Sequence, residues 1–208
     1  MVYIYRPELV MHALIVLTHP DPNSLTHAIA EQVAHGIAAS GSRHSSEIAD
    51  LSVEGFDPRF TRNDHAVLLK QAAPSTEIAA EHARLERADA LVLVYPIYWW
   101  SFPSLLKGWI DRVFTQGWAY EEDENGKLQK KLQHLQVHLL AVGGADQRTY
   151  ARHGYFGAMK TQIDHGIFGY CGAQVLTSEL LLVSDTGFPQ AHLDTARSVG
   201  GKIFAARS

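Results

Sequence analysis

Short apolar runs alternate along the chain with longer stretches in which apolar residues recur at helical spacing. The first run, at residues 13–17, is wholly apolar, as is typical of a strand buried on both faces of a parallel sheet. Residues 24–40 have helical spacing and are followed by Gly41, a residue that favours helix ends. The alternation predicts further strands at residues 46–50, 90–94, 137–142 and 175–183, and further helices at residues 76–87 (or from residue 63), 103–114, 155–170 and 190–206.

Such alternation predicts an α/β domain, in which helices cover both faces of a parallel sheet. No repeat, linker or low-complexity segment divides the chain, and 208 residues are enough for one domain with a sizeable core. We therefore expect a single domain over residues 11–208. Residues 1–10 match neither a strand of this pattern nor a signal peptide, and we expect them to be a mobile N-terminal extension.

Composition narrows the classes of partner. The formal net charge is −4 with both signs interspersed, which argues against a nucleic-acid surface, and no apolar run is long enough for membrane insertion. Cys171 is the single cysteine, so we expect no disulfide framework and a reducing cytoplasm. The 12 histidines show no metal-ligand spacing, so we expect no metal site.

The segment at residues 95–114 carries the most specific signal. It follows an apolar strand, contains Tyr98, Trp99 and Trp100 in succession, and then places Pro103 in the first turn of a helix. Aromatic residues at the carboxyl end of a strand lie where open α/β sheets bind ligands. Three in succession cannot all point into one core. We therefore expect this loop to bind a flat, largely apolar cofactor.

The turn after the first strand, at residues 18–26, has features of a phosphate site. It joins a buried strand to a helix, so backbone N–H groups and the positive end of the helix point at any group bound in front of the helix N-terminus. Ser24 and Thr26 add hydroxyl groups, and Asn23 or Ser24 can cap the helix. A capped helix without a ligand would contain the same residues.

The aromatic segment resembles the flavin-binding loop of the NAD(P)H:quinone oxidoreductases, the DT-diaphorase-like branch of the flavodoxin-like superfamily. The similarity runs from about His12 to Val183. It implies a doubly wound, three-layer α/β fold whose five-stranded parallel sheet has the order 2-1-3-4-5. The shared motif reads Pro96-x-x-Trp99-x-x-x-Pro103-x-x-Leu106-Lys107-Gly108-Trp109.

This resemblance assigns residues to three parts of a flavin site. The first turn would hold the flavin phosphates, the aromatic loop would surround the isoalloxazine ring, and a loop after the fourth strand would meet the N1/O2 edge. Charge collects at that edge when hydride arrives at N5, so donors there stabilise it. The assigned residues are His19, Ser24, Leu25 and Thr26 for the phosphates, Pro96, Ile97, Tyr98, Trp99 and Trp100 for the ring, and Gly143, Gly144 and Tyr150 for the N1/O2 edge.

The resemblance also implies a substrate pocket lined by Trp100, Trp118 and Tyr120, partly from a second subunit. Glu122 stands where the family has a further tyrosine. We expect a homodimer, because Trp100, Phe102, Trp118 and Tyr120 together offer more aromatic surface than one open pocket needs.

One family feature is missing. The family uses a histidine shortly after the tyrosine of the N1/O2 edge, but the matching position here is Phe156. His153 lies three residues earlier and either takes its place or is a solvated loop histidine. The catalytic candidates are therefore Tyr150 and His153.

The implied activity is hydride transfer from NADPH or NADH through the flavin to a quinone or similar acceptor, in a ping-pong cycle. The long first turn, with Pro20 and Pro22, favours FAD, whereas the short segment at residues 60–76 leaves FMN as the alternative. Two other functions stay open: azo- or nitro-reduction at the same site, and a flavin-bound ancillary subunit of a potassium efflux transporter. An electron-carrier flavodoxin is disfavoured because the first turn lacks a short Thr/Ser-rich loop with a glycine.

Overall fold

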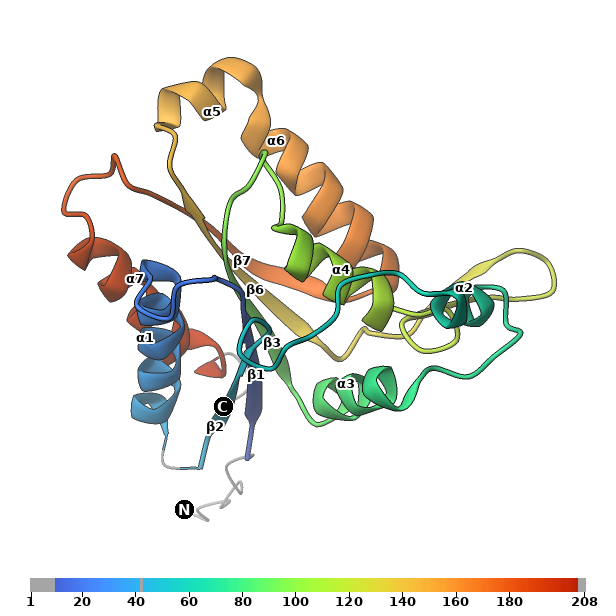
Figure 1. Ribbon diagram of the computed structural model, residues 1–208. Coiled ribbons are helices and arrows are strands. Elements are labelled where there is room, and N and C mark those ends of the chain that lie inside the picture. The colour runs from blue at the N-terminus through green and yellow to red at the C-terminus, as the bar shows by residue number, and fades with distance from the viewer. Residues whose placement is uncertain (1–9, 42, 206–208) are drawn as a thin grey trace, which may run out of the picture.

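A computed structural model describes residues 10–41 and 43–205 (Figure 1). The expected extension at residues 1–10 lies, except for Val10, outside the described residues. The main sheet is parallel and five-stranded, in the order β2-β1-β3-β6-β7, which confirms the expected flavodoxin-like topology. Its strands are β1 (His12–Leu17), β2 (Ser45–Asp50), β3 (Ala90–Pro96), β6 (Gln136–Gly143) and β7 (Gln174–Leu182).

Helices cover both faces of this sheet and make three layers (Figure 1). Helices α1 and α7 pack on one face, and α3, α4 and the π-helix η1 pack on the other. The helices are α1 (Leu25–Ser40), α2 (Arg62–Leu68), α3 (Thr76–Glu86), α4 (Ser104–Val113), α5 (Gln147–His153), α6 (Tyr155–Met159), η1 (Lys160–Gly169) and α7 (Gln190–Lys202).

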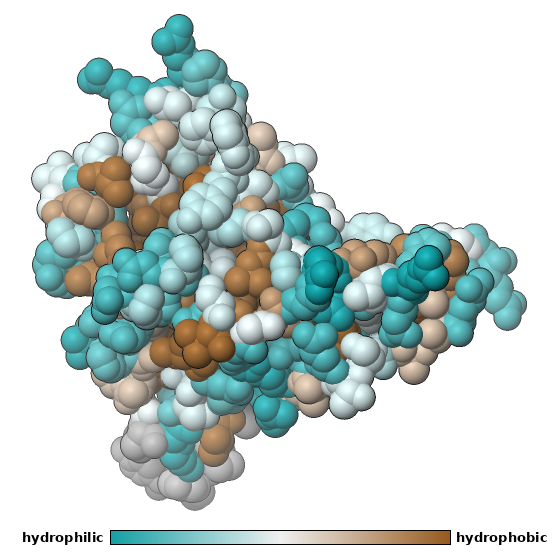
Figure 2. All heavy atoms as spheres, in the orientation of Figure 1, coloured by the Kyte–Doolittle hydropathy of each residue, from teal (hydrophilic) through white to brown (hydrophobic). Residues whose placement is uncertain are grey.

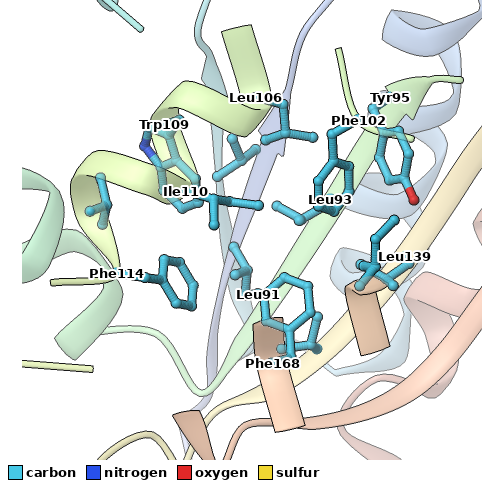
Figure 3. Close-up of a cluster of buried hydrophobic side chains, with 14 of the residues drawn as sticks. Leu91, Leu93, Tyr95, Phe102, Leu106, Trp109, Ile110, Phe114, Leu139 and Phe168 are labelled. Carbon is cyan, nitrogen blue, oxygen red and sulfur yellow. The ribbon is translucent and has the colours of Figure 1, made fainter. Parts of the chain in front are cut away.

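Alternate side chains of β3 supply both halves of the core. Leu91, Leu93 and Tyr95 belong to the core cluster on the side of α4, where Figure 3 shows Leu93 near Leu106 and Ile110 and Tyr95 beside Phe102. The intervening side chains, Val92 and Val94, pack with α1 and α7. The strand is therefore buried on both faces, which explains why its sequence is a continuous apolar run.

Some local elements differ from the sequence prediction. The segment at residues 62–86 forms two helices, because a capping box at Thr61 and Asp64 starts α2, and Lys70 with φ +58° and Ser75 as the next N-cap separate it from α3. A hairpin of β4 (Tyr120–Glu122) and β5 (Leu128–Lys130) was not predicted, since its short strands are largely polar. The expected helix at residues 155–170 is present but adopts π-helical geometry from Lys160 onward.

The surface agrees with the mixed composition. The face in Figure 2 is mostly hydrophilic, with hydrophobic residues in separate groups. Among the described residues, no helix combines the length and apolar character that crossing a bilayer requires.

Candidate functional site

Three loops meet at the carboxyl edge of the sheet. They follow β1, β3 and β6, which are neighbours in the sheet: Leu17 pairs with Val94, and Pro96 pairs with Val142. Neighbouring parallel strands end at the same edge, so the loops that leave them lie together. This is where doubly wound sheets bind their ligands. The topology therefore brings the predicted phosphate turn, aromatic loop and glycine loop to one place.

The aromatic loop is a tight, strained turn. The backbones of Tyr98 and Ser101 exchange two hydrogen bonds of 3.2 and 3.1 Å, which closes the turn over the two tryptophans. Trp99 has φ +50° and Trp100 has φ +62°, values that suit glycine or asparagine at the centre of such a turn. Large side chains held in this conformation store strain, which clusters at binding and catalytic sites. The N–H groups of both tryptophans have no hydrogen-bond partner in the described part of the chain.

The two tryptophan side chains point in different directions. Trp99 is 92% exposed, whereas Trp100 is half-buried and lies against an aromatic group from the loop after β6. Its ring stacks on that of Tyr155, with 3.8 Å between the ring centroids and 13° between the ring planes. It also packs edge-on against Tyr150, with a centroid distance of 5.4 Å and an interplanar angle of 86°. The exposed His153 also stacks on Tyr155, with a ring-centroid distance of 5.2 Å and an interplanar angle of 25°.

Tyr155 was missed by the sequence analysis. It follows Gly154, whose φ of +69° separates α5 from α6, and this break carries Tyr155 toward the aromatic loop. A tyrosine near a glycine is no signal by itself, and the partner Trp100 lies far away in the sequence.

The glycine loop places Tyr150 directly behind the backbone. A Cβ atom at Gly143 would lie 2.7 Å from the Tyr150 hydroxyl and 2.8 Å from Leu182, whereas a Cβ at Gly144 would meet nothing within 4 Å. Tyr150 is almost fully buried, and its hydroxyl has no hydrogen bond to a described residue. Burial raises the pKa of Tyr150, so the hydroxyl stays protonated at neutral pH and is a donor.

In the first turn, the residue that caps α1 is Ser24. Its side chain accepts a hydrogen bond from the His27 N–H at 3.4 Å. His19 Nδ1 lies 3.0 Å from the Asp21 backbone nitrogen and 3.2 Å from the Asp21 carbonyl oxygen, and its Nε2 has no partner among the described residues. Thr26 is 2% exposed and its hydroxyl has no partner among the residues the structure describes. Donors therefore gather at the start of this helix, as an anion site requires.

A second feature of this turn was also missed. The His27 ring lies between Ser24 and Asp50, with Nδ1 2.8 Å from Ser24 Oγ and Nε2 2.8 Å from Asp50 Oδ2. Asp50 is the last residue of β2, so only the pairing of β2 with β1 brings it beside the start of α1.

Trp118 and Tyr120, the other two residues predicted to line the substrate pocket, contact different groups from Trp100. Trp118 stacks on His82 at 4.1 Å and donates from Nε1 to Glu86 at 2.9 Å, which fixes it against α3. Tyr120 meets the edge of Tyr170 and lines a cavity of about 310 Å³. In the described residues neither ring contacts the aromatic group at Trp100. The cavity is also lined by Phe60, Asp64, Leu68, Ile110, Asp111, Arg112, Phe114, Thr115 and Gln116.

Comparisons with known proteins agree with this geometry. Residues 11–198 match the family described as flavodoxin-like fold. NAD(P)H dehydrogenase (quinone) 1 of Rattus norvegicus is 30% identical over 194 residues, which cover 83% of this chain and 69% of the relative.

Solved structures show the same similarity. NAD(P)H:quinone oxidoreductase from Methanothermobacter marburgensis superposes with a TM-score of 0.85 at 26% identity, covering 94% of this chain and 100% of that one. An FMN-dependent NADH-azoreductase from Bacillus anthracis str. Ames Ancestor, in complex with FMN, has a TM-score of 0.67 at 15% identity and covers 95% and 99% of the two chains, which shows the fold alone. Joined to the three loops described above, these matches show that the chain is an oxidoreductase and belongs to the flavodoxin-like family that includes the NAD(P)H:quinone oxidoreductases.

Proposed function

We propose that the protein is a flavin-dependent NAD(P)H:quinone oxidoreductase that works by a ping-pong cycle. The observation that carries the proposal is the strained turn at Trp99 and Trp100. It lies at the carboxyl edge of the sheet, next to the buried Tyr150 hydroxyl and the side-chain-free backbone at Gly143. A flat ring system with a polar edge fits such a combination of aromatic wall, free N–H groups and close backbone.

The residues present fit a flavin in three parts. His19, Ser24, Leu25 and Thr26 would hold the phosphates at the start of α1. Residues 96–100 would hold the ring, with the unpartnered N–H groups of Trp99 and Trp100 toward its polar edge, and Gly143, Gly144 and Tyr150 would meet its N1/O2 side. A bound flavin supplies the hydride chemistry, because it accepts two electrons from NAD(P)H and passes them to an acceptor.

Within this site the protein orients the reactants and stabilises charge. Tyr150 would donate a hydrogen bond from its protonated hydroxyl to the N1/O2 side of the ring. His153, which is exposed and stacks on Tyr155, is the second catalytic candidate of this site. The stacked Trp100 forms a side wall for a planar substrate.

We propose that a second copy of the chain completes the pocket. Trp118 and Tyr120 make no contact with Trp100 within the described part of one chain, so their proposed substrate role requires the partner's copies. Light scattering at micromolar concentration is expected to give the mass of a homodimer, and a monomer would contradict this arrangement.

The experiment that tests the function uses the purified full-length protein. Mass spectrometry of the chromophore released by heating is expected to show FAD, with FMN as the alternative, and steady-state oxidation of NADPH or NADH with a benzoquinone should give parallel double-reciprocal plots. Protein that binds no flavin would contradict the proposal. Flavin-bound protein that reduces azo or nitro compounds but no quinone, or that is captured by a potassium efflux transporter, would favour the corresponding alternative. The lone, buried Cys171 suits the proposed cytoplasmic location.

A further inference from the structure

The start of α1 contains a chain of hydrogen bonds that helix capping alone does not require. Ser24 Oγ lies 2.8 Å from His27 Nδ1, and His27 Nε2 lies 2.8 Å from Asp50 Oδ2. Asp50 is held in place by its other oxygen, which accepts from the backbone N–H groups of Ser52 and Val53. The His27 and Asp50 side chains are 15% and 16% exposed, so this pair is largely shielded from solvent.

This geometry determines where the protons lie. A carboxylate only accepts, so neutral His27 carries its proton on Nε2 and donates it to Asp50. Its Nδ1 is then an acceptor, and the Ser24 hydroxyl must donate to it. In that state Ser24 has no proton to offer a ligand in front of the helix, although its position as N-cap places it there.

We propose that binding of a phosphate group at this turn takes up one proton at His27 and thereby turns the Ser24 hydroxyl into a donor to the phosphate. Once Nδ1 is protonated, it donates to Ser24 Oγ, and the hydroxyl proton is free to point to a phosphate oxygen. The proton comes from solvent, and no covalent bond changes. The inference rests on the proposed flavin function and assigns His27 as a positioning residue that acts through Ser24.

Two buried threonines independently indicate a ligand at this turn. Thr18 and Thr26 are 3% and 2% exposed, yet neither hydroxyl has a hydrogen-bond partner among the described residues. Neither hydroxyl oxygen is among the fully enclosed polar atoms, so both remain accessible to a bound group at this turn. His19 adds a ring nitrogen, Nε2, that has no partner among the described residues, and its ring centroid lies 6.4 Å from that of His27. The Ser24 hydroxyl, released when His27 is protonated, therefore completes a set of polar groups for an anion.

The surrounding charges support uptake of a proton at His27. Asp50 of β2 lies in direct contact and accepts a hydrogen bond from Nε2 in either protonation state of His27. Glu31 lies one turn further along α1, and Asp21 of the first turn directs its carboxylate to the Asn23 N–H. In the first turn, a positive charge on His19 would oppose a positive charge on His27, because the two ring centroids are 6.4 Å apart. In the described residues, α7, which packs on α1, provides no ion pair or hydrogen bond to His27.

The test is calorimetry on the full-length protein stripped of flavin. FMN, FAD and riboflavin are titrated at mildly alkaline pH, where free imidazole groups are neutral, in two buffers with different ionisation enthalpies. We expect FMN and FAD to bind with uptake of close to one proton and riboflavin, which lacks a phosphate, to bind with none. His27→Gln should abolish the uptake and weaken FMN about tenfold, a loss typical of one charge-assisted hydrogen bond.

The control variant is His35→Gln, because His35 is exposed on the same helix and should leave both proton uptake and affinity unchanged. Uptake that persists in His27→Gln, or wild-type protein that binds FMN without uptake, would overturn the inference while leaving the flavin function intact. Wild-type protein that binds none of the three flavins would overturn both.

Discussion

The hydroxyl of Tyr150 lies in the space that a side chain at Gly143 would occupy, 2.7 Å from the position of its Cβ atom. The two residues come from different elements, the end of β6 and helix α5, and only the absence of a side chain at Gly143 lets the tyrosine approach. Gly143 and Tyr150 therefore depend on each other for their positions. The neighbouring Gly144 differs, because a Cβ atom there would meet nothing within 4 Å.

We therefore expect Gly143→Ala to be damaging and Gly144→Ala to be tolerated. The new methyl group at Gly143 has to displace the Tyr150 hydroxyl or Leu182, whereas the one at Gly144 enters open space. Stopped-flow reduction of the bound flavin by NADPH should slow at least tenfold in the first variant and less than twofold in the second. Equal rates in both variants would show that the position of the hydroxyl does not matter.

The Tyr150 hydroxyl itself is expected to assist reduction more than binding. Tyr150→Phe keeps the buried ring but removes a preorganised donor, and loss of such a donor raises a barrier by roughly 2–4 kcal/mol. Flavin reduction should slow accordingly, while the flavin dissociation constant changes less. Tyr155→Phe is the matched control, since it keeps the ring that stacks on Trp100. An unchanged rate in Tyr150→Phe would remove this residue from the mechanism.

The strained turn predicts opposite effects on stability and on binding. Trp99 has φ +50° and is 92% exposed, so it contributes little packing to the folded state. Trp99→Gly should stabilise the flavin-free protein by about 1 kcal/mol in urea unfolding, because glycine adopts this backbone without steric cost. The same change should weaken flavin binding. A variant that is both less stable and equally able to bind flavin would argue against a functional role for the strain.

Stability should fall as the pH is lowered from neutral, largely because of His138. Burial lowers the pKa of this histidine from 6.5 to about 4, and its Nε2 has no hydrogen-bond partner among the described residues. The unfolded chain therefore binds the proton first. The stabilising contribution is complete above the unfolded pKa and decreases toward pH 4, by about 3 kcal/mol in total.

Urea unfolding as a function of pH tests this contribution. His138→Gln does not titrate but can still reach Thr177, the present partner of Nδ1 at 2.9 Å, so its stability should depend less on pH. Burial also lowers the pKa of His82, so part of the pH dependence should remain. A variant with the pH dependence of the wild type would show that His138 is not responsible.

The sequence by itself determined the order of elements and the three loops. Strands such as β3 are buried on both faces and appear in the sequence as continuous apolar runs. In the helices, apolar residues recur at helical spacing, so both signals are local in the sequence. The aromatic loop could be predicted because Tyr98, Trp99 and Trp100 have no place in one core.

The tertiary structure alone decided which residues meet at the carboxyl edge. The stacking of Trp100 on Tyr155 and the pairing of His27 with Asp50 join residues that are far apart in the chain. No periodic pattern encodes such pairs, because they depend on strand order and on the conformation of loops. The β4–β5 hairpin and the π-helical geometry of η1 were missed for a similar reason: few apolar residues mark the hairpin, and helical spacing does not distinguish α- from π-hydrogen bonding.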